Sequence, residues 1–166
     1  MISRQEYQVN KFTKALIPIH HPEYQTKILD VRGEFFSEKT CKELLTDACI
    51  RQLTTFEGAL AAVRKTFLYK KLTPLVVNKQ LEIIAIPTVS PSSYHCIWFF
   101  ASHVHASQTL LASNQSSGTV YFHDHTTLPV PLSFHSLKKK LAQAAMLKDY
   151  CRNEPNYEGD VTPSIQ

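Results

Sequence analysis

The sequence predicts a single α+β domain: a mixed or antiparallel sheet with two helices in the first half of the chain and one late helix. The 166 residues, 43% of them hydrophobic, suffice for one core and are few for two. Strand-like segments come first, followed by two helical segments, further strand-like segments and a last helical one. We expect residues 1–153 to form the domain. Residues 154–166 lack periodicity and carry three acids and no base, so we expect a flexible acidic tail there.

The first strands and the first helix follow from local patterns. Residues 7–20 and 27–36 place apolar residues at alternating positions, which is typical of short strands. Thr40 and Glu43 then form a capping box, with a threonine cap and glutamate at the third helical position. This pattern predicts a helix that begins after Thr40 and ends at about Gln52.

A second, alanine-rich helix is predicted over residues 59–71, between a break at residues 56–58 and Pro74. On such a helix Arg64 and Lys71 would share a face, because seven residues make about two turns. A solvated helix surface is the alternative to a site on this face. The basic residues of this segment are Arg64, Lys65, Lys70 and Lys71.

The second half of the chain is mostly strand-like. Residues 75–78, 81–87 and 94–105 are rich in strand-forming side chains, and the last of these segments is apolar on both faces, which favours a central strand. Residues 112–118 have the composition of a loop, and residues 119–130 that of a hairpin. A single helix is predicted to follow.

That late helix, read with Ser136 as its cap, has Lys138, Lys139 and Lys140 in its first turn. A helix N-terminus carries about half a positive charge, so lysines there reduce stability. The same end of a helix favours phosphate, because its backbone N–H groups have no partner within the helix. The three lysines therefore indicate an anion-binding site.

The basic charge is concentrated in one part of the chain. Residues 1–60 have no net charge, whereas residues 61–153 hold ten Lys and Arg residues against three acids, a net charge of +7. This segregation favours a polyanionic partner, with an ordinary solvated basic face as the alternative. The candidate DNA contacts are Arg64, Lys65, Lys70, Lys71, Lys138, Lys139 and Lys140.

The sequence predicts a cytoplasmic protein without a membrane partner. The first residues contain no apolar segment typical of a signal peptide. The longest apolar run, residues 96–101, is far shorter than the roughly 20 residues of a membrane helix. Cys41, Cys49, Cys96 and Cys151 contain no CxxC pair, so we expect free, buried thiols.

The sequence offers two chemical alternatives, a metal site and a Cys–His enzyme. His103, His105, His123 and His125 form two His-x-His pairs, which could offer imidazoles from neighbouring strands to zinc or iron. A Cys–His enzyme is disfavoured, because Cys96 and its neighbour His95 would point to opposite faces of a strand. There is also no glycine-rich phosphate loop. We therefore expect a non-enzymatic protein with no catalytic residue and no cofactor.

The order and the nearly gap-free spacing of many residues resemble the ComK family of bacterial competence transcription factors over about residues 7–152. No single one of these residues is specific on its own. The residues that carry the resemblance are Tyr7, Val9, Asn10, Thr13, Ala15, Pro18, Cys49, Phe56, Gly58, Pro74, Pro87, Thr88, Cys96, Trp98, Ser102, His103, Val104, His105, Val120, Phe122 and residues 133–137.

The resemblance implies an activator of competence genes that binds paired A/T-rich boxes of double-stranded DNA, largely through the minor groove. It also implies dimers that pair into higher assemblies, located in the cytoplasm and on the nucleoid when bound to DNA. A proteolytic adaptor is a further partner that the family implies, although this chain ends before the C-terminal extension that the adaptor binds.

The chain departs from the family at the residues that follow Gly58. Family members carry an Arg-Lys pair there, whereas this chain has Ala59 and Leu60, and its nearest basic pair is Arg64-Lys65. This departure leaves an alternative function open: a paralogue that does not bind DNA and regulates a true competence factor through protein contacts.

Overall fold

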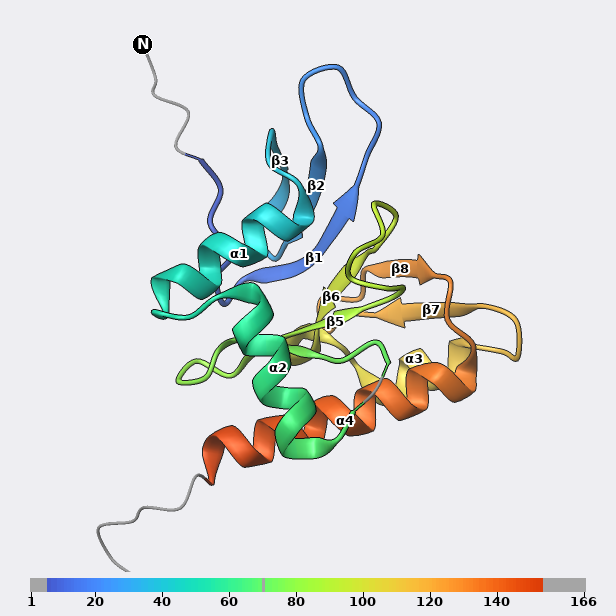
Figure 1. The fold of residues 1–166 in the computed structure, drawn as a ribbon. Helices are drawn as coiled ribbons and strands as arrows, with labels where there is room; N and C mark the ends of the chain where they lie inside the picture. The colour runs from blue at the N-terminus through green and yellow to red at the C-terminus, as the bar shows by residue number, and fades with distance from the viewer. Residues whose placement is uncertain (1–5, 70, 154–166) are drawn as a thin grey trace, which may run out of the picture.

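The computed structural model describes residues 6–69 and 71–153, which include a six-stranded sheet, a two-stranded hairpin and four α-helices (Figure 1). The strand order of the large sheet is β3-β2-β1-β6-β5-β4, and every neighbouring pair is antiparallel. The predicted α+β class is therefore confirmed. The strands of this sheet are β1 (Thr13–Pro18), β2 (Thr26–Asp30), β3 (Gly33–Ser37), β4 (Leu75–Asn78), β5 (Ile83–Pro87) and β6 (Trp98–Phe100).

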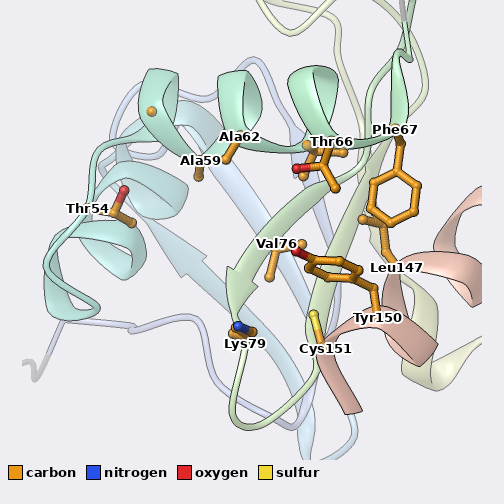
Figure 2. A pocket seen from close by; sticks show the side chains of 12 residues that line it. Thr54, Ala59, Ala62, Thr66, Phe67, Val76, Lys79, Leu147, Tyr150 and Cys151 are labelled. Carbon is orange, nitrogen blue, oxygen red and sulfur yellow. The ribbon is translucent and has the colours of Figure 1, made fainter. Parts of the chain in front are cut away.

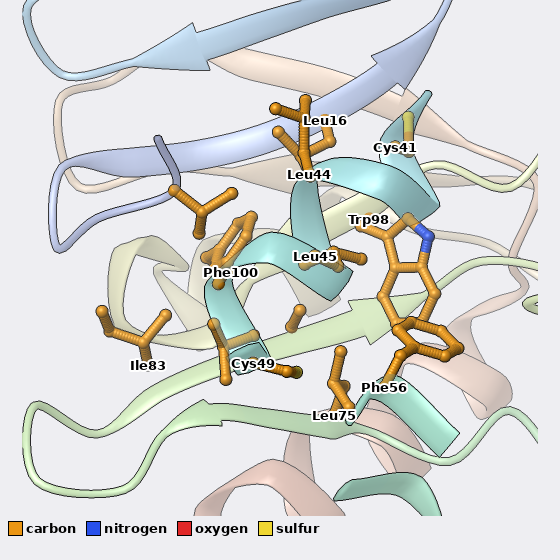
Figure 3. Packing of buried hydrophobic residues seen from close by; sticks show 14 of the residues in the cluster. Leu16, Cys41, Leu44, Leu45, Cys49, Phe56, Leu75, Ile83, Trp98 and Phe100 are labelled. Carbon is orange, nitrogen blue, oxygen red and sulfur yellow. The ribbon is translucent and has the colours of Figure 1, made fainter. Parts of the chain in front are cut away.

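One face of this sheet is covered by α1 (Cys41–Arg51) and the first half of α2 (Phe56–Phe67). Leu44 and Leu45 of α1 pack on Trp98 and Phe100 of β6, and Phe56 meets the Trp98 ring edge-on at 5.9 Å between centroids (Figure 3). Aromatic pairs prefer such edge-to-face contacts. This core therefore fixes where α2 begins.

The opposite face is covered by the β7–β8 hairpin and by α4 (Phe134–Arg152). Phe99 points to this side, whereas its neighbours in β6 point to the other, so the strand is buried on both faces as predicted for a central strand. The hairpin consists of β7 (Gly118–Tyr121) and β8 (Thr127–Val130), which confirms the predicted turn between them.

The segment after β6 differs from the prediction. The strand ends at Phe100, and a 3₁₀ turn (η1, Ala101–His103) and a helix, α3 (Ala106–Ala112), replace the end of the predicted strand. The His105 side chain caps α3 by accepting a hydrogen bond from the Gln108 N–H at 3.2 Å. Histidine is not among the residues that commonly cap a helix, so the sequence contained no usual signal for this one.

Two helices begin earlier than predicted. Residues 56–58 are the first turn of α2, because the side chain of Thr55 accepts a hydrogen bond from the Gly58 N–H. Ser133, not Ser136, caps α4. The capping box of α1, in contrast, is confirmed at its threonine: the Thr40 side chain accepts from the Glu43 N–H, and the helix ends at Arg51.

The cysteines agree with the prediction. Cys41, Cys49 and Cys96 are free and buried, as expected, while Cys151 is half-buried. Burial raises the pKa of the Cys41 thiol to about 11. In the described part of the chain, no helix is both long and apolar enough to cross a membrane.

Candidate nucleic-acid interface

The predicted shared face of Arg64 and Lys71 does not exist, because α2 ends before Lys71. Phe67 is the last helical residue, and Leu68 follows in the left-handed conformation at φ 58°. The chain then runs through a connection to β4, which begins at Leu75. Lys71 is an exposed residue of this connection, and Lys70 lies outside the described residues.

Two side chains hold this α2–β4 connection against the two helices. From α2, the Arg64 Nε atom donates a hydrogen bond to the Oγ1 atom of buried Thr73 at 3.1 Å. From α4, the Lys140 Nζ atom donates to the carbonyls of Lys71 and Leu72 at 2.8 and 2.6 Å. The structure thus brings α4 against α2 and the connection, although Lys140 lies 69 residues after Lys71 in the sequence.

Lys140 was predicted as an exposed DNA contact, and this prediction is wrong about its location. The residue is only 5% exposed, and its ammonium group also donates to the Gln143 side chain at 3.2 Å. Burial, and to a smaller extent the positive charge of Lys139, lowers the pKa of Lys140 to about 8. An ammonium group buried with three protein acceptors has a structural role.

The reasoning from the helix N-terminus also fails for the other two lysines. Because α4 begins at Phe134, Lys138 and Lys139 lie in its second turn, beyond the unpaired N–H groups of the first. Both side chains are exposed. They can bind an anion through their own charge, but the helix end contributes little to that site.

The directions of Lys138 and Lys139 differ by about 100°, as expected for successive helical residues. Lys139 lies on the side of α4 that faces the connection. Met146, about two turns further along that side, accepts a hydrogen bond from the Tyr69 hydroxyl at 3.8 Å. Lys138 points away from the buried Lys140 and lies on the outer surface of the helix.

We call the exposed cations of this region the basic surface. Within the described residues, none of its lysines forms an ion pair, and Arg64 has only a neutral partner. Most cations of the first half are instead paired with carboxylates, as Lys39 is with Asp47 at 2.5 Å. Unneutralised charge is what a polyanion would bind. The basic surface consists of Arg64, Lys65, Lys71, Lys138 and Lys139.

The two positions at which the family resemblance implies an Arg-Lys pair face inward in this chain. Ala59 is 9% exposed and Leu60 is 5% exposed, and both belong to the core beneath the sheet. Ala59 also lines a hollow of about 290 Å³ between α2, β4 and the C-terminal turns of α4 (Figure 2). Its lining is mostly apolar and contains none of the predicted DNA contacts.

The four histidines are engaged in the fold or lie apart. His103 shares a 2.7 Å hydrogen bond with the Lys11 carbonyl, and His105 caps α3. The His105 and His123 rings are 5.6 Å apart, and His125 lies in the hairpin turn at φ 69°. Among the described residues, no group of three or more His, Cys, Asp or Glu side chains could hold a metal ion.

Sequence reasoning missed the role of Lys140, although a signal for it exists. Leu137, Lys140, Ala144 and Leu147 follow one another at spacings of three, four and three residues, which places them on one face of a helix. All four are buried. A lysine within such an apolar stripe is a candidate for a buried ammonium group.

Comparison with known proteins agrees with the resemblance in the sequence. The family model described as ComK protein matches residues 4–154. The chain belongs to the ComK family. It is also 23% identical over 145 residues to a protein named competence transcription factor from Bacillus subtilis (strain 168). That alignment covers 87% of this chain and 74% of the Bacillus protein. No solved structure gives a significant match.

Proposed function

We propose that this chain is a competence-type transcription factor that activates genes by binding A/T-rich double-stranded DNA, without enzymatic activity. Membership of the ComK family and the name of the Bacillus relative support a role in transcription. The observation that carries the proposal is the basic surface, whose cations are exposed and lack carboxylate partners among the described residues. Such cations release counterions when they meet phosphates, which supplies affinity.

The geometry favours a role for Arg64 in the minor groove. Its guanidinium group is held by Thr73 beside the α2–β4 connection, so part of its conformational freedom is lost before DNA binds. A narrow A-tract minor groove concentrates negative potential and attracts arginine. Lys71 and Lys139, on the same side of the molecule, would contact phosphates and fix the position of the protein on the duplex.

The proposal includes dimers or higher assemblies in the cytoplasm, bound to the nucleoid when DNA is engaged. Two copies would read two boxes on one duplex. Control by a proteolytic adaptor belongs to the same proposal, since the family implies it.

A second candidate function is supported by the core positions of Ala59 and Leu60. At the two positions where the family resemblance implies cations, this chain carries two buried apolar residues. A paralogue that regulates a true competence factor by protein contacts would not need those cations. Such a protein would copurify with a full-length relative and show no preference among duplexes.

The test is fluorescence anisotropy with a labelled duplex carrying two phased A/T boxes and a G/C-rich control, at several salt concentrations. We expect tighter binding to the A/T duplex and a steep loss of affinity with salt. Replacing Lys71 and Lys139 by Gln should reduce the slope of log K against log salt by about 2, because each lost phosphate contact removes about 0.9.

The matched control replaces two cations of the first half, Lys27 and Lys42, by Gln. These residues pair with Glu34 and Glu57 at 3.3 and 3.6 Å, so the same change in net charge should leave the slope nearly unaltered. If both double variants reduced the slope equally, the result would show only a general effect of net charge. Weak, equal binding of the unmodified chain to both duplexes would refute DNA reading and favour the second candidate.

A further inference from the structure

We propose that β3 is the surface through which two copies of this chain pair, edge to edge and antiparallel, into one continuous sheet. The inference rests on the self-association in the proposed function and names its interface. The large sheet has two edges, β3 and β4. The four residues from Gly33 to Phe36 are all exposed, whereas β4 alternates buried and half-buried positions and contacts α2.

The residues of β3 suit pairing rather than its prevention. Natural proteins protect edge strands with proline, bulges or charged side chains. β3 contains no proline and no bulge, and its one charged side chain, Glu34, is paired with Lys27 at 3.3 Å. Phe35 and Phe36 are 38% and 47% exposed, one on each face of the sheet. Aromatic side chains of this kind stabilise cross-strand pairs.

The backbone of β3 has hydrogen-bonding groups directed away from β2. The Ser37 carbonyl accepts a hydrogen bond from the Gln25 N–H at 2.9 Å, so Ser37 faces the β2 side. Backbone groups of an antiparallel strand alternate in direction. Those of Phe35 therefore also face β2, and those of Glu34 and Phe36 point outward, available to a further strand.

Charge complementarity selects one register for a pair of identical strands. If the twofold axis passes through Phe35, Glu34 stands opposite Phe36 of the second copy and exchanges N–H···O hydrogen bonds with it. Two residues further along, just outside β3, Arg32 stands opposite Glu38 of the second copy, so opposite charges meet at both ends. An axis through Glu34 would instead place the two Glu34 residues opposite each other, and an axis through Phe36 would place Glu34 opposite Glu38 of the second copy. Both arrangements bring like charges together, which is destabilising.

Arg32 is already positioned for this contact. Its guanidinium group binds the buried Asp30 carboxylate at 2.9 Å and lies over the Phe12 and Phe35 rings at 4.9 and 5.8 Å. The side chain nevertheless remains 53% exposed. Glu38 is exposed, and among the described residues its carboxylate has no ion-pair partner.

The register gives a cross-linking test on the DNA-free protein. In a pair centred on Phe35, the two Phe35 Cα atoms lie about 4.5 Å apart, a distance within the range of disulfides. In a Cys151→Ser background, which removes the half-buried thiol, Phe35→Cys should form a covalent dimer on mild oxidation. Glu34→Cys is the matched control. In this register Glu34 does not stand opposite Glu34 of the second copy, so this variant should not form a covalent dimer.

The second test measures the dimer dissociation constant by sedimentation velocity. Glu38→Arg turns two symmetric attractive contacts into repulsive ones, so we expect the constant to rise about tenfold or more. Glu23→Arg makes the same charge change in the exposed β1–β2 loop and should leave the constant unchanged. Both sites are exposed, so neither variant should unfold.

Equal cross-linking of the two cysteine variants, or a dissociation constant unaffected by Glu38→Arg, would overturn the β3 interface. A chain that stays monomeric at all concentrations would overturn it as well. None of these results bears on DNA reading, which the anisotropy measurement decides separately.

Discussion

The buried ammonium group of Lys140 leads to a prediction about stability whose magnitude follows from its surroundings. A pKa lowered from 10.5 to about 8 corresponds to about 3–4 kcal/mol that favours the neutral amine over the ammonium, at about 1.4 kcal/mol per pH unit. The three hydrogen bonds of the ammonium group, at about 1 kcal/mol each, stabilise the folded state by a similar amount and so offset the cost of burying the charge.

We therefore expect Lys140→Met to change the free energy of unfolding by no more than about 1 kcal/mol near neutral pH. Methionine removes both the charge and its hydrogen bonds, and it keeps most of the packed stem. Lys140→Ala also removes about three buried methylene groups, so it should be less stable than the Met variant by about 2 kcal/mol. Urea unfolding followed by circular dichroism measures both values.

The pH dependence distinguishes a buried ammonium group from simple packing. Between pH 8 and 10.5 the folded state binds fewer protons at Lys140 than the unfolded chain does, so stability rises with pH in this window. Between about pH 8 and about pH 10, the free energy of unfolding of the unmodified protein should therefore rise by about 2 kcal/mol relative to that of Lys140→Met. Equal stability of the Met and Ala variants, together with parallel pH profiles, would refute the reasoning.

Three further changes test contacts of the fold outside the basic surface. Gly118→Ala should lower the free energy of unfolding by about 1–3 kcal/mol, because the added methyl group would overlap the Leu132 backbone carbonyl and the Leu137 side chain; an unchanged melting temperature would contradict this overlap. The ammonium of buried Lys14 lies 2.7 Å from the Asp124 carboxylate, and Asp124→Asn removes this counter-charge. The free energy of unfolding in urea should then fall by about 2 kcal/mol at neutral pH. Burial opposes ionisation of Asp124, but the hydrogen bond from Lys14 lowers the pKa of this carboxyl from 3.8 to about 2, so the difference should vanish as the pH falls through this range; a constant difference would argue against the ion pair. Thr55→Ala should cost about 1 kcal/mol in thermal unfolding, with Thr55→Ser nearly neutral, because the Thr55 hydroxyl caps α2; equal losses would exclude the cap.

Much of the fold was predictable because local rules decide it. The threonine cap of α1, the hairpin after residue 118 and the central strand around Phe99 all depend on side chains within a few residues of one another. The start of α2 at Phe56 was missed, although Thr55 is a usual cap, because the glycine two residues later suggested a break. The helix α3 was missed because its cap is a histidine.

The candidate site was only partly predictable. Charge segregation identified the basic half of the chain, and Lys139 is exposed as expected. The same lysine run also suggested Lys140, whose acceptors are carbonyls of the α2–β4 connection, far earlier in the chain. A helical pattern shows which residues share a face, but it cannot show what packs against that face.

The sequence alone determined the family, the α+β class, the free thiols of Cys41, Cys49 and Cys96 and the position of most strands. Periodicity and capping act over short distances, so a local pattern suffices for the elements. Only the tertiary structure decided which cations are buried, which are paired and which sheet edge is exposed. Each of these depends on groups that are remote in sequence and adjacent in space. Lys140 became structural, and Glu34 to Phe36 became an open edge, through neighbours that no local pattern contains.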